Sequence, residues 1–187
     1  MATGRETKLT GSVGEFRVAA ELCRRGLLAT PFAGNVPHYD IIASGQRGGH
    51  LAIQVKAING STWQLDIRRF LKIQRKGPRQ IPKGLEREPY PGLVCVLVAL
   101  SKSGNDRFFI LTWRELRRIV ARGYRRYLRK YGGVRPKAPG SFHTALSIES
   151  VTGFEGRWKL LLRGVRKMPN RDLQPSAANK KRRGRRG

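Results

Sequence analysis

Acidic residues are scarce in this chain of 187 residues. Only 12 Asp and Glu stand against 39 Lys and Arg, which gives a formal charge of +27 and a sequence pI near 11.6. Such a charge attracts polyanions over long range, and nucleic acid is the commonest polyanionic partner of a protein. An anionic membrane surface is the other candidate that the charge allows.

Cysteine and histidine are also rare. Cys23 and Cys95 are the two cysteines, and neither has a metal-ligand spacing such as CxxC, so we expect both to be buried, reduced thiols. The three histidines, His38, His50 and His143, are scattered and form no HxxxH pair. The pattern argues against a zinc site.

Long hydrophobic runs are absent from the sequence. The longest, residues 93–100 (LVCVLVAL), is far shorter than the roughly 20 residues that a membrane-spanning helix needs. The N-terminus is polar and charged through Lys8, which is unlike a signal peptide. We therefore expect a soluble, cytoplasmic and nucleoid-associated protein without a membrane partner.

Composition divides the chain into three parts. We expect a flexible N-terminus over residues 1–9, an α/β domain over 10–168, and a disordered basic tail over 169–187. Periodicity and turn residues predict strands at 27–32, 39–43, 51–58, 63–67, 93–100, 108–111 and 141–150, with helices at 10–25, 69–74, 113–131 and 154–166. Residues 75–91 are expected to be a loop. This order predicts a mixed central β-sheet flanked by helices.

The predicted strands at 39–43 and 51–58 carry the most informative polar residues. The stretch reads HYDIIASGQRGGHLAIQVKA, two strands joined by a Gly-rich turn, which is typical of a hairpin. Alternation places Gln54 and Lys56 on one face of the second strand, where Asp40 of the first strand can meet them. The backbone carbonyl of Val55 lies along the same rim.

These residue types suit metal-assisted cleavage of a phosphodiester. Asp40 offers a carboxylate and Gln54 an amide oxygen, both hard ligands for Mg²⁺, and Lys56 is a cation that can stabilise the transition state. Glu15, on the first predicted helix, reaches the same metal if that helix packs beside the hairpin. The alternative is structural, with Asp40 capping a turn and Lys56 solvated.

The stretches GSVGEFRVAAELCRRGL, HYDIIA and LAIQVKA together resemble the PD-(D/E)XK nuclease superfamily, in particular its archaeal Holliday junction resolvase-like branch. The resemblance covers roughly residues 10–75 and is weaker over the predicted strand at 93–100. It implies a restriction-endonuclease-like fold and cleavage of DNA, with branched or junction DNA as one substrate, using Mg²⁺ or Mn²⁺. It also implies a homodimer, because resolvase-like relatives pair two sites.

The resemblance assigns each family position to one residue of this chain. The helix glutamate corresponds to Glu15, the motif aspartate to Asp40, the second acid to Gln54 and the lysine to Lys56. Tyr39 stands where the family has proline. Glutamine at the second acidic position removes a negative charge from the site, so the resemblance implies weaker metal binding and leaves loss of activity open.

Residues 113–131 (WRELRRIVARGYRRYLRKY) form a predicted helix with two distinct faces. The expected packing stripe recurs at steps of three and four and contains Leu116, Ile119, Val120, Tyr124, Tyr127, Leu128 and Tyr131. The remaining positions are cationic: Arg114, Arg117, Arg118, Arg122, Arg125, Arg126, Arg129 and Lys130. With one acid in the helix, we expect this face to bind a phosphate backbone, while a membrane-surface helix and plain solubility are alternatives.

Two further basic segments extend the predicted nucleic-acid surface. The tail has the block Lys180, Lys181, Arg182 and Arg183, followed by Arg185 and Arg186. The predicted loop adds Arg75, Lys76, Arg79 and Lys83. Contacts of this kind give affinity and register without base specificity.

The sequence therefore leaves two main hypotheses for the function. The first is a metal-dependent DNA endonuclease that uses Glu15, Asp40, Gln54 and Lys56. The second is a non-catalytic nucleic-acid-binding protein, associated with the ribosome or the nucleoid, which the charge and the missing second acid favour. A structural subunit of a larger ribonucleoprotein is a third hypothesis.

Overall fold

The computed structural model describes residues 4–32, 38–46 and 48–167, with side chains through Val165. Its centre is a five-stranded mixed sheet in the order β1-β2-β3-β7-β8. The bounds of these strands are β1 Leu28–Pro31, β2 Ile41–Ser44, β3 His50–Ile58, β7 Val94–Ala99 and β8 Arg107–Thr112. The pair β3–β7 is parallel and the other pairs are antiparallel. The α/β class with a mixed central sheet is confirmed.

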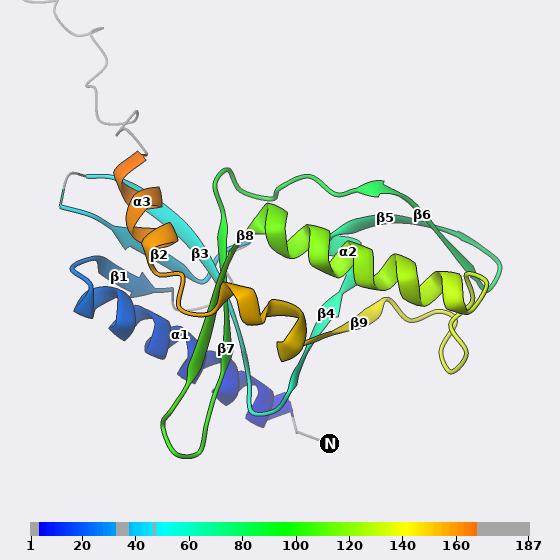
Figure 1. The fold of residues 1–187 in the computed structure, drawn as a ribbon, viewed down its shortest axis with the longest axis horizontal. Coiled ribbons are helices and arrows are strands. Elements are labelled where there is room, and N and C mark those ends of the chain that lie inside the picture. The colour runs from blue at the N-terminus through cyan, green and yellow to red at the C-terminus, as the bar shows by residue number, and fades with distance from the viewer. Residues whose placement is uncertain (1–3, 33–37, 47, 168–187) are drawn as a thin grey trace, which may run out of the picture.

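Helices cover both faces of this sheet (Figure 1). Helices α1 (Gly4–Arg24) and α3 (Lys159–Lys167) pack on one face, against a core that contains Ile53, Val55 and Val96. Helix α2 (Trp113–Lys130) packs on the other, against a core that contains Leu97, Phe109 and Leu111. Strand β7 is buried along its whole length, as its uninterrupted apolar sequence predicts.

Two small two-stranded sheets complete the α2 side of the molecule. Strands β4 (Thr62–Asp66) and β9 (His143–Ser147) pair with each other, and so do β5 (Leu71–Lys76) and β6 (Arg79–Leu85). Two 3₁₀-helices, η1 (Ile67–Arg69) and η2 (Ile148–Phe154), follow β4 and β9. Figure 1 shows β5 and β6 lying beside α2.

The structure corrects the prediction for residues 69–91. The expected helix at 69–74 and the expected loop at 75–91 are largely the antiparallel β5–β6 pair. The strand expected at 141–150 ends at Ser147, and the closing helix begins at Lys159. The first helix begins at Gly4, within the segment expected to be flexible.

The packing of α1 leaves Cys23 exposed, so the expectation that this thiol is buried is wrong. Gly14, Val18, Ala19 and Leu22 face the sheet, whereas Phe16 is 66% exposed and Val13 and Cys23 are exposed. A Cβ on Gly14 would lie 2.4 Å from the Cβ of Ala57 on β3, so the helix backbone sits directly on that strand. The small residue, not the aromatic one, sets the packing side.

Of the helices that the structure describes, none combines the length and the apolar character needed to cross a membrane.

Candidate active site

The β2–β3 hairpin brings Asp40 next to Gln54. Ile41 pairs with Ile53, so the register places Asp40 opposite Gln54 one step further along. The backbone N–H of Asp40 donates to the carbonyl of Ile53 at 2.9 Å, and the N–H of Val55 donates to Oδ2 of Asp40 at 2.7 Å. The predicted hairpin is thus confirmed, and the Asp40 carboxylate caps the edge of β3 just before β2 begins.

This capping also orients the Val55 backbone. A strand residue directs its N–H and its C=O to the same edge. Because the Val55 N–H points to Asp40, the Val55 carbonyl lies on that edge as well. The carbonyl oxygen of Val55 and the carboxylate of Asp40 therefore lie at the same edge of β3.

Gln54 and Lys56 line one cavity of about 530 Å³. Both side chains lie on the α2 side of the sheet, since those of Ile53 and Val55 pack into the opposite core. Gln54 is only 7% exposed, and across residues 4–32, 38–46 and 48–167 no protein group hydrogen-bonds its amide. The Lys56 ammonium has no ion pair within the same ranges. These polar ends are available to a ligand.

Glu15 reaches the same neighbourhood from α1. Burial raises the pKa of the Glu15 carboxyl above its ordinary value, the negative charge of Asp40 raises it further, and the positive charge of Lys56 lowers it. These effects require Glu15 to lie close to Asp40 and Lys56. Asp40 and Glu15 are not in the lining of the 530 Å³ cavity, and Asp40 lies at the edge of β3, where its carboxylate accepts from the Val55 N–H.

The donor set suits a hard divalent cation. Magnesium prefers carboxylate, carbonyl and amide oxygens, and Glu15, Asp40, Val55 and Gln54 together carry all three types. The negative charge of Asp40 raises the pKa of the Glu15 carboxyl, and a bound cation would reduce this repulsion. Among the described residues, no cluster of three or more His, Cys, Asp or Glu forms a metal site. The amide and the backbone carbonyl are therefore essential to the proposed ligand set.

The cavity has neighbours that the sequence alone did not assign to the site. Asp66 at the end of β4 and Arg69 in η1 both line it. Arg68 hydrogen-bonds the Asp66 carboxylate and thereby lowers its pKa, so Asp66 is engaged within the protein. Cys95, opposite Gln54 on β7, is buried, which raises the pKa of its thiol to about 12 and keeps it protonated. Arg69 is the added cation at this cavity.

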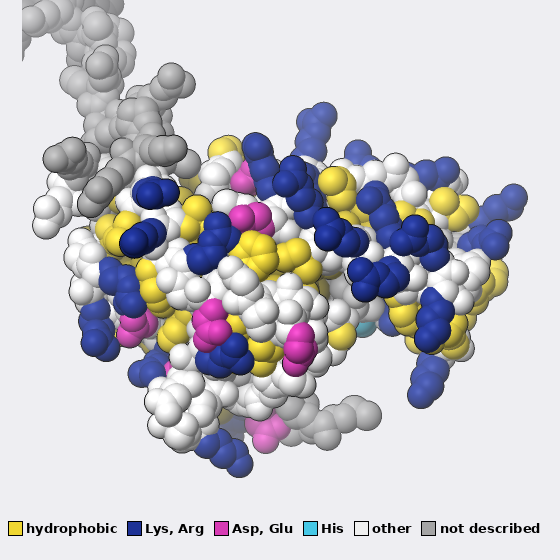
Figure 2. Space-filling model, viewed as in Figure 1, with side chains coloured by type: hydrophobic (Ala, Val, Ile, Leu, Met, Phe, Trp, Pro, Cys, Tyr) yellow, Lys and Arg dark blue, Asp and Glu magenta, His cyan; other side chains and the backbone are white. Residues whose placement is uncertain are grey.

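The cationic face of α2 is largely exposed. Figure 2 shows Lys and Arg side chains gathered over α2 and the β5–β6 pair. Exposed members of the predicted set are Arg114, Arg118, Arg122, Arg125, Arg126, Arg129 and Lys130. Arg114 makes an ion pair with Glu88, and the half-buried Arg117 donates to the carbonyl of Glu86. Arg75, Lys76, Arg79 and Lys83 are exposed on β5 and β6.

Two of the three α2 tyrosines were placed wrongly by the sequence pattern. Tyr124 is in the core, but Tyr127 and Tyr131 are 36% and 37% exposed. Ala121 takes a core position instead, because β6 approaches α2 on that side. The predicted contacts of Lys180, Lys181, Arg182 and Arg183 lie outside the described residues.

Comparisons with known proteins give a likeness of fold but no family. No protein-family model and no curated protein sequence matches the chain. Among solved structures, the fold is similar to that of a bacterial homing endonuclease, I-Ssp6803I, at 15% identity and a TM-score of 0.46, covering 84% of this chain and 93% of that one. At this level of similarity, a function has to be inferred from the residues themselves. The resemblance to the resolvase-like branch stays a hypothesis.

Proposed function

We propose that this chain is a metal-dependent endonuclease that acts on DNA. The observation that carries the proposal is the Gln54 amide, which has no protein partner in the described part of the chain. It shares a cavity with the Lys56 ammonium and lies next to the Asp40 carboxylate. An amide that faces a cavity without a protein partner is free to bind a ligand that enters this cavity.

Each residue has a defined task in the proposed reaction. Glu15, Asp40, Gln54 and the Val55 carbonyl would hold Mg²⁺ or Mn²⁺, which supplies Lewis-acid chemistry at the phosphodiester when bound. The Val55 N–H fixes the orientation of Asp40. The Lys56 ammonium faces the reacting phosphate and stabilises the negative charge that develops there.

The basic surface supplies affinity in this proposal. The exposed arginines of α2 would hold the phosphate backbone without reading bases. Branched or junction DNA is the substrate form that the family resemblance implies. Symmetric cleavage of such DNA needs two sites, so a homodimer belongs to the same proposal.

The experiment compares cleavage and binding by the wild type and Lys56→Ala on branched, single-stranded and double-stranded DNA. Loss of one transition-state donor is expected to lower the cleavage rate by about 10²-fold to 10³-fold while DNA binding remains. Lys102→Ala removes the same charge from the exposed β7–β8 loop and is expected to cleave normally. If the wild type cuts none of these substrates in Mg²⁺ or Mn²⁺, the enzymatic proposal is wrong.

A non-catalytic nucleic-acid-binding protein is the second candidate. The neutral Gln54 and the lack of a three-acid cluster among the described residues favour it. It predicts binding that weakens steeply as salt rises and nucleic acid that stays intact whether or not EDTA is present.

A further inference from the structure

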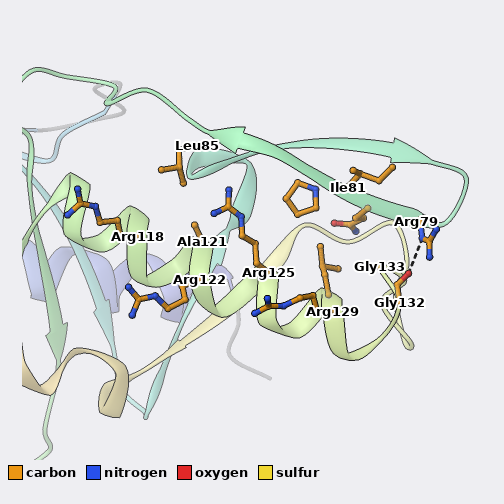
Figure 3. Close-up of a pocket in the computed structure, with 13 residues that line it drawn as sticks. Arg79, Ile81, Leu85, Arg118, Ala121, Arg122, Arg125, Arg129, Gly132 and Gly133 are labelled. Atoms are coloured by element: carbon orange, nitrogen blue, oxygen red, sulfur yellow. Dashed lines mark hydrogen bonds between the residues drawn. The ribbon is translucent and has the colours of Figure 1, made fainter.

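A second groove, of about 870 Å³, lies between α2 and β6 (Figure 3). It shares no lining residue with the cavity at Gln54. Its cationic residues come from both elements: Arg118, Arg122, Arg125 and Arg129 from α2, and Arg79 from β6. Its apolar lining includes Ile81, Leu85, Ala121 and Leu128, and no acidic side chain lines it.

The four α2 arginines form a continuous row. Positions 118, 122, 125 and 129 recur at steps of four and three, so the side chains share one face over about 16 Å of helix. Like charges at such spacing repel one another. In the part of the chain that the structure describes, none of these four side chains makes an ion pair or a hydrogen bond. The repulsion among these four side chains is therefore not compensated within the fold, and a bound polyanion would reduce it.

The walls of the groove are held together before any ligand binds. Nε of Arg79 donates to the carbonyl of Gly132 at 2.9 Å, which ties β6 to the turn after α2. Behind that wall, the buried Gln80 accepts from the hydroxyl of Tyr124 at 2.7 Å and donates to the carbonyls of Pro139 and Ser141. A groove with fixed walls loses little conformational freedom on binding.

We propose that this groove binds one unpaired strand of nucleic acid, with phosphates on the α2 arginines and bases or sugars on the apolar lining. A duplex presents its bases within grooves that admit protruding elements such as a helix or a ribbon. A concave surface with a cationic row and an apolar floor instead suits a strand whose bases are turned outward, and arginine planes can stack on those bases. The inference deepens the proposed function and rests on it for the identity of the polyanion.

An acidic protein segment is the other polyanion of suitable size. The net charge of +27 and the regular row of arginines favour nucleic acid, whose phosphates repeat along a strand. Polyglutamate therefore serves as the competitor in the test.

The test measures binding of a labelled oligothymidine in EDTA, where no cleavage occurs, at several salt concentrations. Arg122→Gln with Arg125→Gln removes two charges from the groove. Because each phosphate contact on a single strand contributes about 0.7 to the salt slope, this variant is expected to lose roughly 25-fold in affinity at 0.1 M salt, and its slope falls by about 1.4. Lys8→Gln with Lys102→Gln removes the same charge at exposed positions outside the groove and outside α2, and is expected to bind within about threefold of the wild type.

A substitution in the apolar lining of the groove distinguishes binding in the groove from general electrostatic attraction. Leu85 is exposed in the groove, so Leu85→Ser is expected to weaken oligothymidine binding several-fold and to leave the salt slope unchanged. Equal losses in the two charge variants would overturn the inference. So would a duplex of equal length that binds as tightly, or polyglutamate that displaces the strand as well as unlabelled oligothymidine does.

The outcome is independent of cleavage. If the wild type cuts no DNA but the groove variants lose strand binding as expected, only the enzymatic proposal fails. If the wild type cuts DNA and the groove variants bind oligothymidine normally, only the groove inference fails.

Discussion

The close approach of Gly14 to Ala57 predicts the effect of a substitution at Gly14 on the free energy of unfolding. A Cβ at position 14 would meet the Ala57 Cβ at 2.4 Å, whereas carbon atoms in contact prefer about 3.5–4.0 Å. Gly14→Ala therefore requires α1 to move away from β3 by more than about 1 Å. Overpacking of this kind costs about 1–3 kcal/mol, and the better helix propensity of alanine offsets up to about 1 kcal/mol of it.

The expected net loss is about 1–2 kcal/mol of unfolding free energy, which lowers Tm by roughly 2–8 °C for a chain of this size. Gly11→Ala is the matched control, because Gly11 lies on the same helix and a Cβ there would have no neighbour within 4 Å. That control is expected to gain about 0.5–1 kcal/mol. Urea and thermal unfolding measure both variants. Equal stability of the two would refute the assigned packing of α1.

The same substitution also tests the site. Glu15 follows Gly14 in the chain, so a shift of α1 moves its carboxyl relative to Asp40. A displacement of about 1 Å can lower a catalysed rate by about 100-fold. Gly14→Ala is therefore expected to cleave DNA far more slowly than Gly11→Ala while binding it equally well.

Three further predictions concern individual side chains. The pKa of Glu15 is raised in the folded state, so ionisation of this carboxyl destabilises the fold. The destabilisation is complete above the raised pKa and absent below the ordinary carboxyl pKa. Glu15→Gln should therefore raise Tm at neutral pH and leave it unchanged near pH ~3. Tyr124→Phe leaves Oε1 of Gln80 without its donor and is expected to cost about 1–2 kcal/mol in urea unfolding. Gln54→Glu adds a carboxylate to a buried position, so we expect a lower Tm in EDTA and half-maximal cleavage at a lower Mg²⁺ concentration.

Local patterns predict the centre of the fold well. Strand β7 is apolar at every position because both its faces are covered, and α2 begins at a capping box between Thr112 and Glu115. The Gly-rich turn and the alternation after it predict the β2–β3 hairpin, and the register then brings Asp40 to Gln54. In these elements, neighbouring residues alone determine the structure.

The β5–β6 pair was missed because its stability comes from distant contacts. Its sequence is rich in charge, proline and glycine, which is typical of a loop. Gln80 holds it in place through Tyr124, 44 residues away, and through Pro139 and Ser141. The groove beside α2 could not be predicted for the same reason.

Helical periodicity also left open which side of α1 packs. Val13 and Phe16 recur at helical spacing, but so do Gly14, Val18 and Leu22. The sheet selects the second set because Gly14 lets the backbone approach β3. Similarly, Arg69 lines the cavity at Gln54 from η1, which follows β4, and β4 pairs with the distant strand β9.

The most direct test of the account is Mg²⁺-dependent cleavage of DNA by the wild type and by Asp40→Ala, each measured with Mg²⁺ and with EDTA. We expect strand breaks only from the wild type in Mg²⁺, with nucleic-acid binding retained by the variant. Equal cleavage by Asp40→Ala, or cleavage that persists in EDTA, would contradict a metal site built at the edge of β3.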